Sequence, residues 1–276
     1  MSRIITSHHH ELIQKLVMEI SDRDHSSIAA ELTELISIIH KDIPEKKRIS
    51  TGRYSIVKAL GSEIYYHLKD AGIDIQKFST GLFGIQDIDP FVRSIAVQLF
   101  SLVALDSGDP KTILPVFEKA AADDDWIVRE CSSGLVRKLT RAFPDLMRAW
   151  YLDLVQSEDA NQRRFVSESL RPVVENKWFQ KDPEYALGII QNLYYESDPY
   201  PRTSVGNSLS DWLRVDKVVA WPIVEELASN GDQNSHWIAY RACRNLVQKE
   251  PLKVMDLLGV EEYKYKSRVH RKADYQ

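Results

Sequence analysis

The hydrophobic positions along the chain recur at the spacing of one helical face and not at the spacing of a strand. Leu12, Leu16 and Ile20 form one apolar stripe, and Leu32, Leu35 and Ile39 continue another. Short segments containing Asp, Ser, Gly or Pro separate the stripes, at residues 21–25, 41–45, 106–110, 157–160, 198–201 and 230–232. Such residues begin and end helices, and no stretch alternates apolar with polar residues. The pattern predicts an all-α protein of roughly a dozen or more helices joined by short connections.

A repeat occupies the later two-thirds of the chain. Each copy carries an anchor residue in the first turn of a helix, and the anchors are Arg93, Arg129, Arg163, Arg202 and Tyr240. They stand 36, 34, 39 and 38 residues apart, a period typical of two-helix units in an α-α superhelix, a HEAT-like repeat solenoid with a concave groove. We expect a helical cap at residues 1–85, groove-bearing repeats at 86–259 and a basic, aromatic tail at 260–276.

The third and seventh positions after each anchor are small or apolar, as expected where one repeat packs on the next. These positions are Ala96, Phe100, Ser132, Val136, Val166, Leu170, Val205, Leu209, Cys243 and Val247. Both cysteines of the chain fall on or near packing positions, so we expect inert core thiols.

A second stripe, at positions one, five and eight or nine after the anchors, carries mixed charge. It contains the carboxylates Glu130, Glu168 and Asp211. Among them stand Arg137, Lys138, Arg164, Arg171, Thr203, Asn207, Arg241, Asn245 and Lys249. An ordinary solvated helix face explains mixed charge. Basic groups around central acids also fit a surface that contacts phosphates and holds a cationic group between them.

Composition and net charge exclude few further classes of protein. Of 276 residues, 43% are hydrophobic and 28% charged, with a formal charge of −4, which fits a globular protein and excludes a uniformly basic surface. No long apolar run or signal-like segment is evident, which favours a cytoplasmic protein. His8, His9 and His10 lack a nearby acid or Cys at ligand spacing, so we expect no metal site there.

Aromatic residues lie close to the charged stripe. Trp126 precedes Glu130 by four residues, so both can project from the same helical face, where the indole could stack on a base or a cationic ring. For its counterpart Trp237, packing between repeats is the favoured interpretation. The segment 261–272 interleaves Tyr with basic residues, which fits a flexible nucleic-acid-contacting arm or an ordinary solubilising terminus.

Three segments resemble bacterial DNA alkylation repair proteins of the AlkC and AlkD type. Residues 163–172, RRFVSESLRP, resemble the AlkC motif RR-x-x-S-E-x-x-R-P. Residues 198–211, DPYPRTSVGNSLSD, and 237–259, which begin with WIAY and end with LLG, resemble two later AlkC segments in the same order. The pair Trp126 and Glu130 is similar to a Trp and an acid four residues apart in the groove of AlkD proteins.

The resemblance implies a monomeric, cofactor-free glycosylase that removes cationic alkylated bases, such as N3- or N7-alkylpurines, from duplex DNA. It implies catalytic roles for Glu130, Glu168 and Asp211, with Trp126 and Asn207 at the base or sugar. It further implies phosphate contacts from Arg137, Arg164, Arg171, Arg241 and Lys249. Whether the lesion is flipped stays open, as does action on bulky adducts.

The alternative is a non-catalytic HEAT-repeat scaffold that binds DNA or a protein partner. The acids distinguish the two, because a scaffold has no need of three carboxylates near Trp126. We find no phosphate-binding loop, dinucleotide fingerprint or nucleophile elbow that would indicate another enzyme class.

Overall fold

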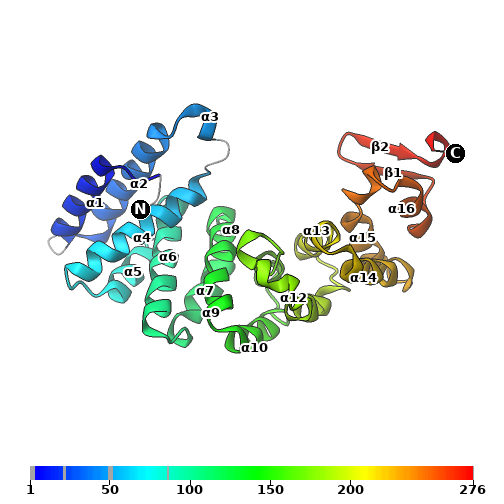
Figure 1. Cartoon of the computed structure of the whole chain (residues 1–276). Helices are drawn as coiled ribbons and strands as arrows, with labels where there is room; N and C mark the ends of the chain where they lie inside the picture. The colour runs from blue at the N-terminus through cyan, green and yellow to red at the C-terminus, as the bar shows by residue number, and fades with distance from the viewer. Residues whose placement is uncertain (1–3, 21–22, 49–51, 86, 276) are drawn as a thin grey trace. The chain divides into compact units, whose positions relative to one another are not determined.

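The computed structural model describes residues 4–20, 23–48, 52–85 and 87–275, and these contain sixteen α-helices and one short hairpin (Figure 1). The predicted all-α fold of stacked helices is confirmed. The chain divides into two compact units, Met1–Phe143 and Pro144–Gln276, which we call the N-terminal and C-terminal units. Each is described by itself below.

The N-terminal unit is built on an apolar central helix, α6. Its helices are α1 (Ser7–Glu19), α2 (His25–Asp42), α3 (Glu45–Arg48), α4 (Arg53–Asp70), α5 (Ile75–Phe83), α6 (Pro90–Ser107), α7 (Leu114–Ala121), α8 (Trp126–Leu135) and α9 (Arg137–Ala142). Helices α4, α5 and α8 all pack on α6. Buried residues between Ile5 and Leu82 therefore share one core with α6, and the boundary between compact units lies at 143/144, within the predicted run of repeats.

The C-terminal unit stacks three helices in sequence order, α11 on α13 and α13 on α15. Its helices are α10 (Pro144–Leu154), α11 (Ala160–Ser169), α12 (Pro183–Ile190), α13 (Pro199–Val215), α14 (Lys217–Ser229), α15 (Gln233–Ala242) and α16 (Pro251–Leu257). Short 3-10 turns fill the connections, including Val174–Gln180 and Leu246–Gln248. The hairpin strands are β1 (Glu262–Tyr265) and β2 (Arg268–Arg271).

An aspartate begins the first helix of every repeat. Asp89, Asp125, Asp159, Asp198 and Asp232 each accept a hydrogen bond from a first-turn backbone N–H, at 2.7 to 2.8 Å. An N-cap carboxylate satisfies an orphan amide and interacts favourably with the positive end of the helix. The repeated Asp therefore sets the register of the array.

Arg93, Arg163 and Arg202 each contact the next repeat. Arg93 Nη2 lies 2.9 Å from Asp123, in the connection before α8. Arg163 Nε lies 2.6 Å from Glu196, in the connection before α13. Arg202 lies over the Trp237 ring, 4.9 Å from its centroid, and the ring is half-buried. The packing interpretation of Trp237 fits this contact.

The ten predicted packing positions are all buried, with at most 2% of any residue exposed. The repeat register derived from the anchors is therefore confirmed. Burial raises the pKa of the Cys131 thiol to about 11 and that of Cys243 to about 12, so both stay protonated at neutral pH.

Among the described residues only α6 has the length and mean hydropathy of a membrane span, and 61% of that helix is buried in the core.

The C-terminal segment is an ordered hairpin, so the interpretation as a flexible arm is wrong. The Tyr and basic residues alternate, which places Tyr263 on the inner face of β1, where it is fully buried. Its ring stacks on Tyr240 of α15, with centroids 4.2 Å apart, and its hydroxyl donates to the Tyr240 carbonyl at 2.7 Å. On the opposite face, Lys264 and Arg271 are exposed and both pair with Glu262.

Candidate nucleic-acid interface

Helix α8 presents an aromatic ring and a carboxylate to solvent. Trp126 opens the helix directly after its cap, Asp125, and is 63% exposed. Glu130 follows four residues later and is also exposed. Residues at this spacing are neighbours on one helical face. The exposed ring is therefore accessible to a ligand that could stack on it.

The other two predicted acids meet at one arginine in the C-terminal unit. Arg171 follows the end of α11, and its Nη1 lies 3.0 Å from Glu168 Oε2. Its Nε donates to Asp211 Oδ2 on α13 at 2.8 Å. Ser204, also on α13, donates to the other oxygen of Glu168 at 2.6 Å. Glu168, Arg171, Asp211 and Ser204 form what we call the arginine network.

Burial and charge set the ionisation of the arginine network. Burial alone would raise the pKa of Glu168, whose side chain is 4% exposed. The attraction of Arg171 and Arg164, with the hydrogen bond from Ser204, outweighs burial and holds that pKa below its ordinary value. Burial would lower the pKa of Arg171, but Glu168 and Asp211 hold it above its ordinary range. Glu168 is therefore an ionised carboxylate whose negative charge is paired with Arg171 and Arg164, and it has no proton to donate.

Arg164 also contacts this network. Its Nη2 lies 3.7 Å from Glu168, and its guanidinium lies over the Tyr200 ring, 4.6 Å from the centroid. Arg164 and Arg171 are both predicted to contact phosphates, and both are ion-paired with Glu168. The three predicted acids consequently differ in setting, because Glu130 is exposed while Glu168 and Asp211 are buried.

A basic pocket of about 460 Å³ lies between α13, α15 and the hairpin. Its lining residues are Asn207, Arg241, Arg244, Asn245, Tyr265, Lys266, Ser267 and Arg268. Four of these are cationic and none is acidic, in a chain of net charge −4. Such a lining favours a polyanion such as a phosphate backbone.

The pocket is held in shape from both sides. Arg241 Nε donates to Asn207 Oδ1 at 2.9 Å, and its guanidinium lies over the Tyr265 ring, 4.9 Å from the centroid. Burial, together with Arg241 and Arg171, lowers the pKa of Arg244, so an anion in the pocket would relieve repulsion among these cations. The hairpin turn at Lys266, with φ of 55°, supplies the outer wall.

The sequence prediction found two pocket residues, Asn207 and Arg241, and missed Arg244, Lys266 and Arg268. The interleaved Tyr and basic residues of 261–272 were the available signal for the last two. Of the other predicted phosphate contacts, Arg137 is half-buried on α9 in the N-terminal unit. Lys249 is exposed beside a smaller hollow of about 240 Å³ in the C-terminal unit.

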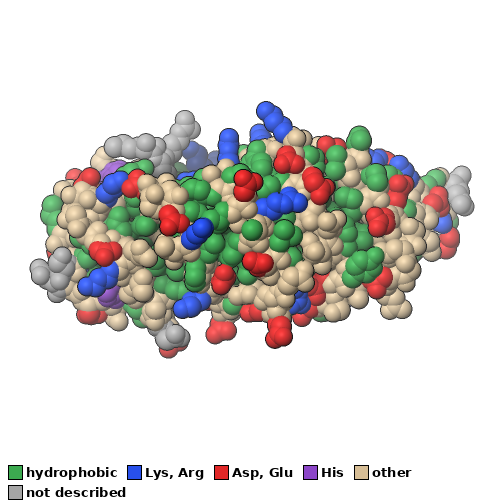
Figure 2. All heavy atoms as spheres, turned by 90° about the horizontal axis from the view of Figure 1, so that it is seen from below, with side chains coloured by type: hydrophobic (Ala, Val, Ile, Leu, Met, Phe, Trp, Pro, Cys, Tyr) green, Lys and Arg blue, Asp and Glu red, His purple; other side chains and the backbone are tan. Residues whose placement is uncertain are grey.

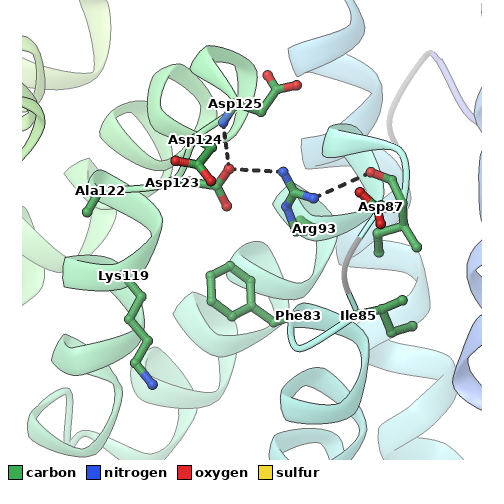
Figure 3. A pocket seen from close by; sticks show the side chains of 10 residues that line it. Phe83, Ile85, Asp87, Arg93, Lys119, Ala122, Asp123, Asp124 and Asp125 are labelled. Carbon is green, nitrogen blue, oxygen red and sulfur yellow. Dashed lines mark hydrogen bonds and ion pairs between the residues drawn. The ribbon is translucent and has the colours of Figure 1, made fainter.

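A hollow of about 700 Å³ in the N-terminal unit contains none of the predicted site residues (Figure 3). It is lined by Asp87, Asp123, Asp124 and Asp125 together with Arg93. Asp123 accepts from Arg93 and from the backbone N–H of Asp125 at 2.9 Å each. These bonds belong to the repeat linkage and the α8 cap, so this hollow has a structural role.

On the face shown in Figure 2, acidic and basic side chains are interspersed among apolar ones.

Two solved structures share this fold. One is AlkD2 from Streptococcus mutans, with a TM-score of 0.56, 20% identity, and coverage of 77% of this chain and 97% of that chain. The other is smu.31 from Streptococcus mutans UA159, with a TM-score of 0.55, 20% identity, and coverage of 76% and 97%. No protein-family model and no curated protein matches the chain. The chain therefore has an AlkD-like fold of helical repeats, and the family resemblance seen in the sequence is confirmed at the level of the fold.

Proposed function

We propose that the protein is a DNA glycosylase that hydrolyses the N-glycosidic bond of cationic alkylated bases in duplex DNA. The observation that carries the proposal is the exposed pair Trp126 and Glu130 on one face of α8, in a chain with an AlkD-like fold. We place the protein in the cytoplasm and expect it to act as a monomer on N3- or N7-alkylpurines.

The chemistry requires negative charge more than a proton. An alkylated purine already carries positive charge, and it leaves as a neutral base while charge passes to the sugar as an oxocarbenium ion. A carboxylate near the sugar stabilises that ion and orients the water that attacks C1′. Glu130, which is exposed on α8 beside the Trp126 ring, is the carboxylate we assign to this step. Trp126 would contact the cationic base or the deoxyribose.

Glu168 and Asp211 receive a positioning role in this proposal. Their ion pairs hold Arg171 and Arg164 in place, and a partly neutralised carboxylate stabilises a developing cation less than an exposed one. Phosphate contacts are assigned to the basic pocket, where Arg241 and Arg244 stand with Lys266 and Arg268. Binding through this pocket should weaken as salt rises, because each neutralised phosphate releases counterions.

The direct test is release of methylpurines from N-methylated duplex DNA by the wild type and by Glu130→Gln. We expect the wild type to release bases and Glu130→Gln to lose about a hundredfold or more of the rate while it still binds duplex. Glu34→Gln, an exposed glutamate on α2, is the matched control and should keep the wild-type rate. Equal rates for Glu130→Gln and the control would contradict the assignment.

A second candidate is a DNA-binding protein without catalysis. The observation that favours it is the arginine network, which occupies two of the three predicted catalytic acids. This candidate predicts salt-dependent duplex binding through the basic pocket and no base release by the wild type. The same assay therefore separates the two functions.

A further inference from the structure

Two imidazoles and one carboxylate meet between α1 and α4 in the N-terminal unit. His10 projects from the first turns of α1, and Glu63 and His67 stand four residues apart on α4. One ligand atom from each of the three lies within 4.8 Å of the others. The three side chains are half-buried and so remain reachable from solvent. The cluster takes no part in the proposed chemistry of α8.

The neighbouring histidine shows what a structural imidazole looks like in this helix. His9 is fully buried, and both ring nitrogens are used: Nδ1 accepts from the Thr6 backbone N–H at 3.1 Å, and Nε2 pairs with Asp42 at 2.9 Å. These bonds cap α1 and tie it to α2. His9 thus needs no further partner.

His10 is different. Its Nδ1 lies 3.5 Å from Glu63 Oε2, beyond a good hydrogen bond. Its Nε2 is buried and has no hydrogen-bond partner among the described residues. Nδ1 is therefore the ring nitrogen that faces Glu63 and can act as a ligand, because the two nitrogens of one imidazole point in different directions. The His67 ring lies nearby, with its centroid 6.4 Å from that of His10.

We propose that His10, Glu63 and His67 bind a divalent transition metal ion, with Zn²⁺ as the best match. Imidazole nitrogens and a carboxylate oxygen are typical zinc ligands, with bond lengths of about 2.0 to 2.2 Å. Tetrahedral ligands at that distance lie about 3.4 Å apart, close to the 3.5 Å between His10 and Glu63. The widest separation, 4.8 Å, closes by small side-chain rotations.

A metal ion bound here would link α1 to α4. His9 already joins α1 to α2 through Asp42, and the metal would join the same helix to α4. Three protein ligands leave a fourth position for water or a further ligand. Binding should therefore stabilise the N-terminal unit by mass action, since the ligands come together only in the folded chain.

Equilibrium dialysis of Zn²⁺ against tag-free, full-length protein tests the proposal. We expect one Zn²⁺ per chain and a higher thermal midpoint with Zn²⁺ than with a chelator. His67→Ala and Glu63→Gln should each weaken Zn²⁺ binding about tenfold or more. Circular dichroism in chelator shows whether each variant is folded, and Co²⁺ in place of Zn²⁺ reports tetrahedral coordination through its visible absorption.

His8→Ala is the matched control, because it shortens the histidine run at residues 8–10 but spares the cluster. Wild-type affinity in His8→Ala, with losses in His67→Ala and Glu63→Gln, would support the site. Loss in His8→Ala with none in His67→Ala would show that the histidine run binds metal by itself and would overturn the proposal. Absence of Zn²⁺ binding by the wild type at micromolar concentration would also overturn it.

Discussion

Helix α8 and the α11–α13 pair both carry carboxylates on the charged stripe, yet the two regions use them differently. Glu130 on α8 is exposed beside an exposed indole. Glu168 on α11 and Asp211 on α13 are buried and share Arg171. An exposed carboxylate is solvated by water, whereas a buried one must be paired to remain ionised.

The neighbours in sequence explain this difference. Glu168 has Arg164 four residues before it and Arg171 three residues after it, so two guanidiniums reach it from its own segment. Glu130 has Trp126 and Ser133 at the same two spacings. The repeat register therefore places an acid on the stripe, but its sequence neighbours decide whether it joins an arginine network, as Glu168 does.

The largest expected effect is on the stability of the C-terminal unit. Arg171→Ala leaves Glu168 and Asp211 buried without their shared cation, which should cost about 3–5 kcal/mol of unfolding free energy. Denaturant unfolding measures it. Arg214→Ala is the control, because Arg214 is 67% exposed and lies 3.6 Å from Asp211, and it should cost less than about 1 kcal/mol. Similar losses of unfolding free energy in both variants would contradict the structural role that we assign to the buried acids and Arg171.

A smaller effect is expected at the exposed indole. Trp126→Ala should lower the rate of base release about tenfold, because an aromatic contact with a base contributes roughly 1–3 kcal/mol. The unfolding free energy should change little, since the ring is 63% exposed. A destabilised variant with an unchanged rate would mean that Trp126 serves the fold.

The basic pocket should affect binding without affecting stability. Arg268→Ala should weaken duplex binding several-fold at low salt and reduce the salt slope by about one. Fluorescence anisotropy across a salt series measures both quantities. Lys181→Ala, an exposed lysine outside the pocket, should leave them unchanged. An unaltered salt slope in Arg268→Ala would exclude the pocket from the interface.

The smallest effect is on acid stability. The folded pKa of Glu168 lies below its ordinary value of 4.5, so its ion pairs contribute stability above about pH 4.5. That contribution is lost as pH falls through the folded pKa, where the carboxylate takes up a proton. Unfolding curves between pH 7 and pH 3 should show a shallower acid decline in Glu168→Gln than in the wild type. An identical decline would mean that Glu168 is not ionised in the folded protein.

The fold was predictable because its signals are local and repeated. The Asp caps and the buried packing positions recur in every repeat, and Arg93, Arg163 and Arg202 each contact the next repeat. The ion pairs of Glu168 with Arg164 and Arg171 follow from helical spacing, but its burial against α13 does not. Two further features were not readable. Arg244 and Arg268 meet only once the hairpin docks on α15, and His10 meets His67 only once α1 packs on α4.

The most direct test of the division of roles measures base release and unfolding free energy side by side for Glu130→Gln and Glu168→Gln. We expect Glu130→Gln to keep wild-type stability within about 0.5 kcal/mol and to lose base release. We expect Glu168→Gln to lose about 1–3 kcal/mol of stability and, where folded, to retain most of the activity. A folded Glu168→Gln without activity beside an active Glu130→Gln would contradict this division and place the chemistry in the arginine network.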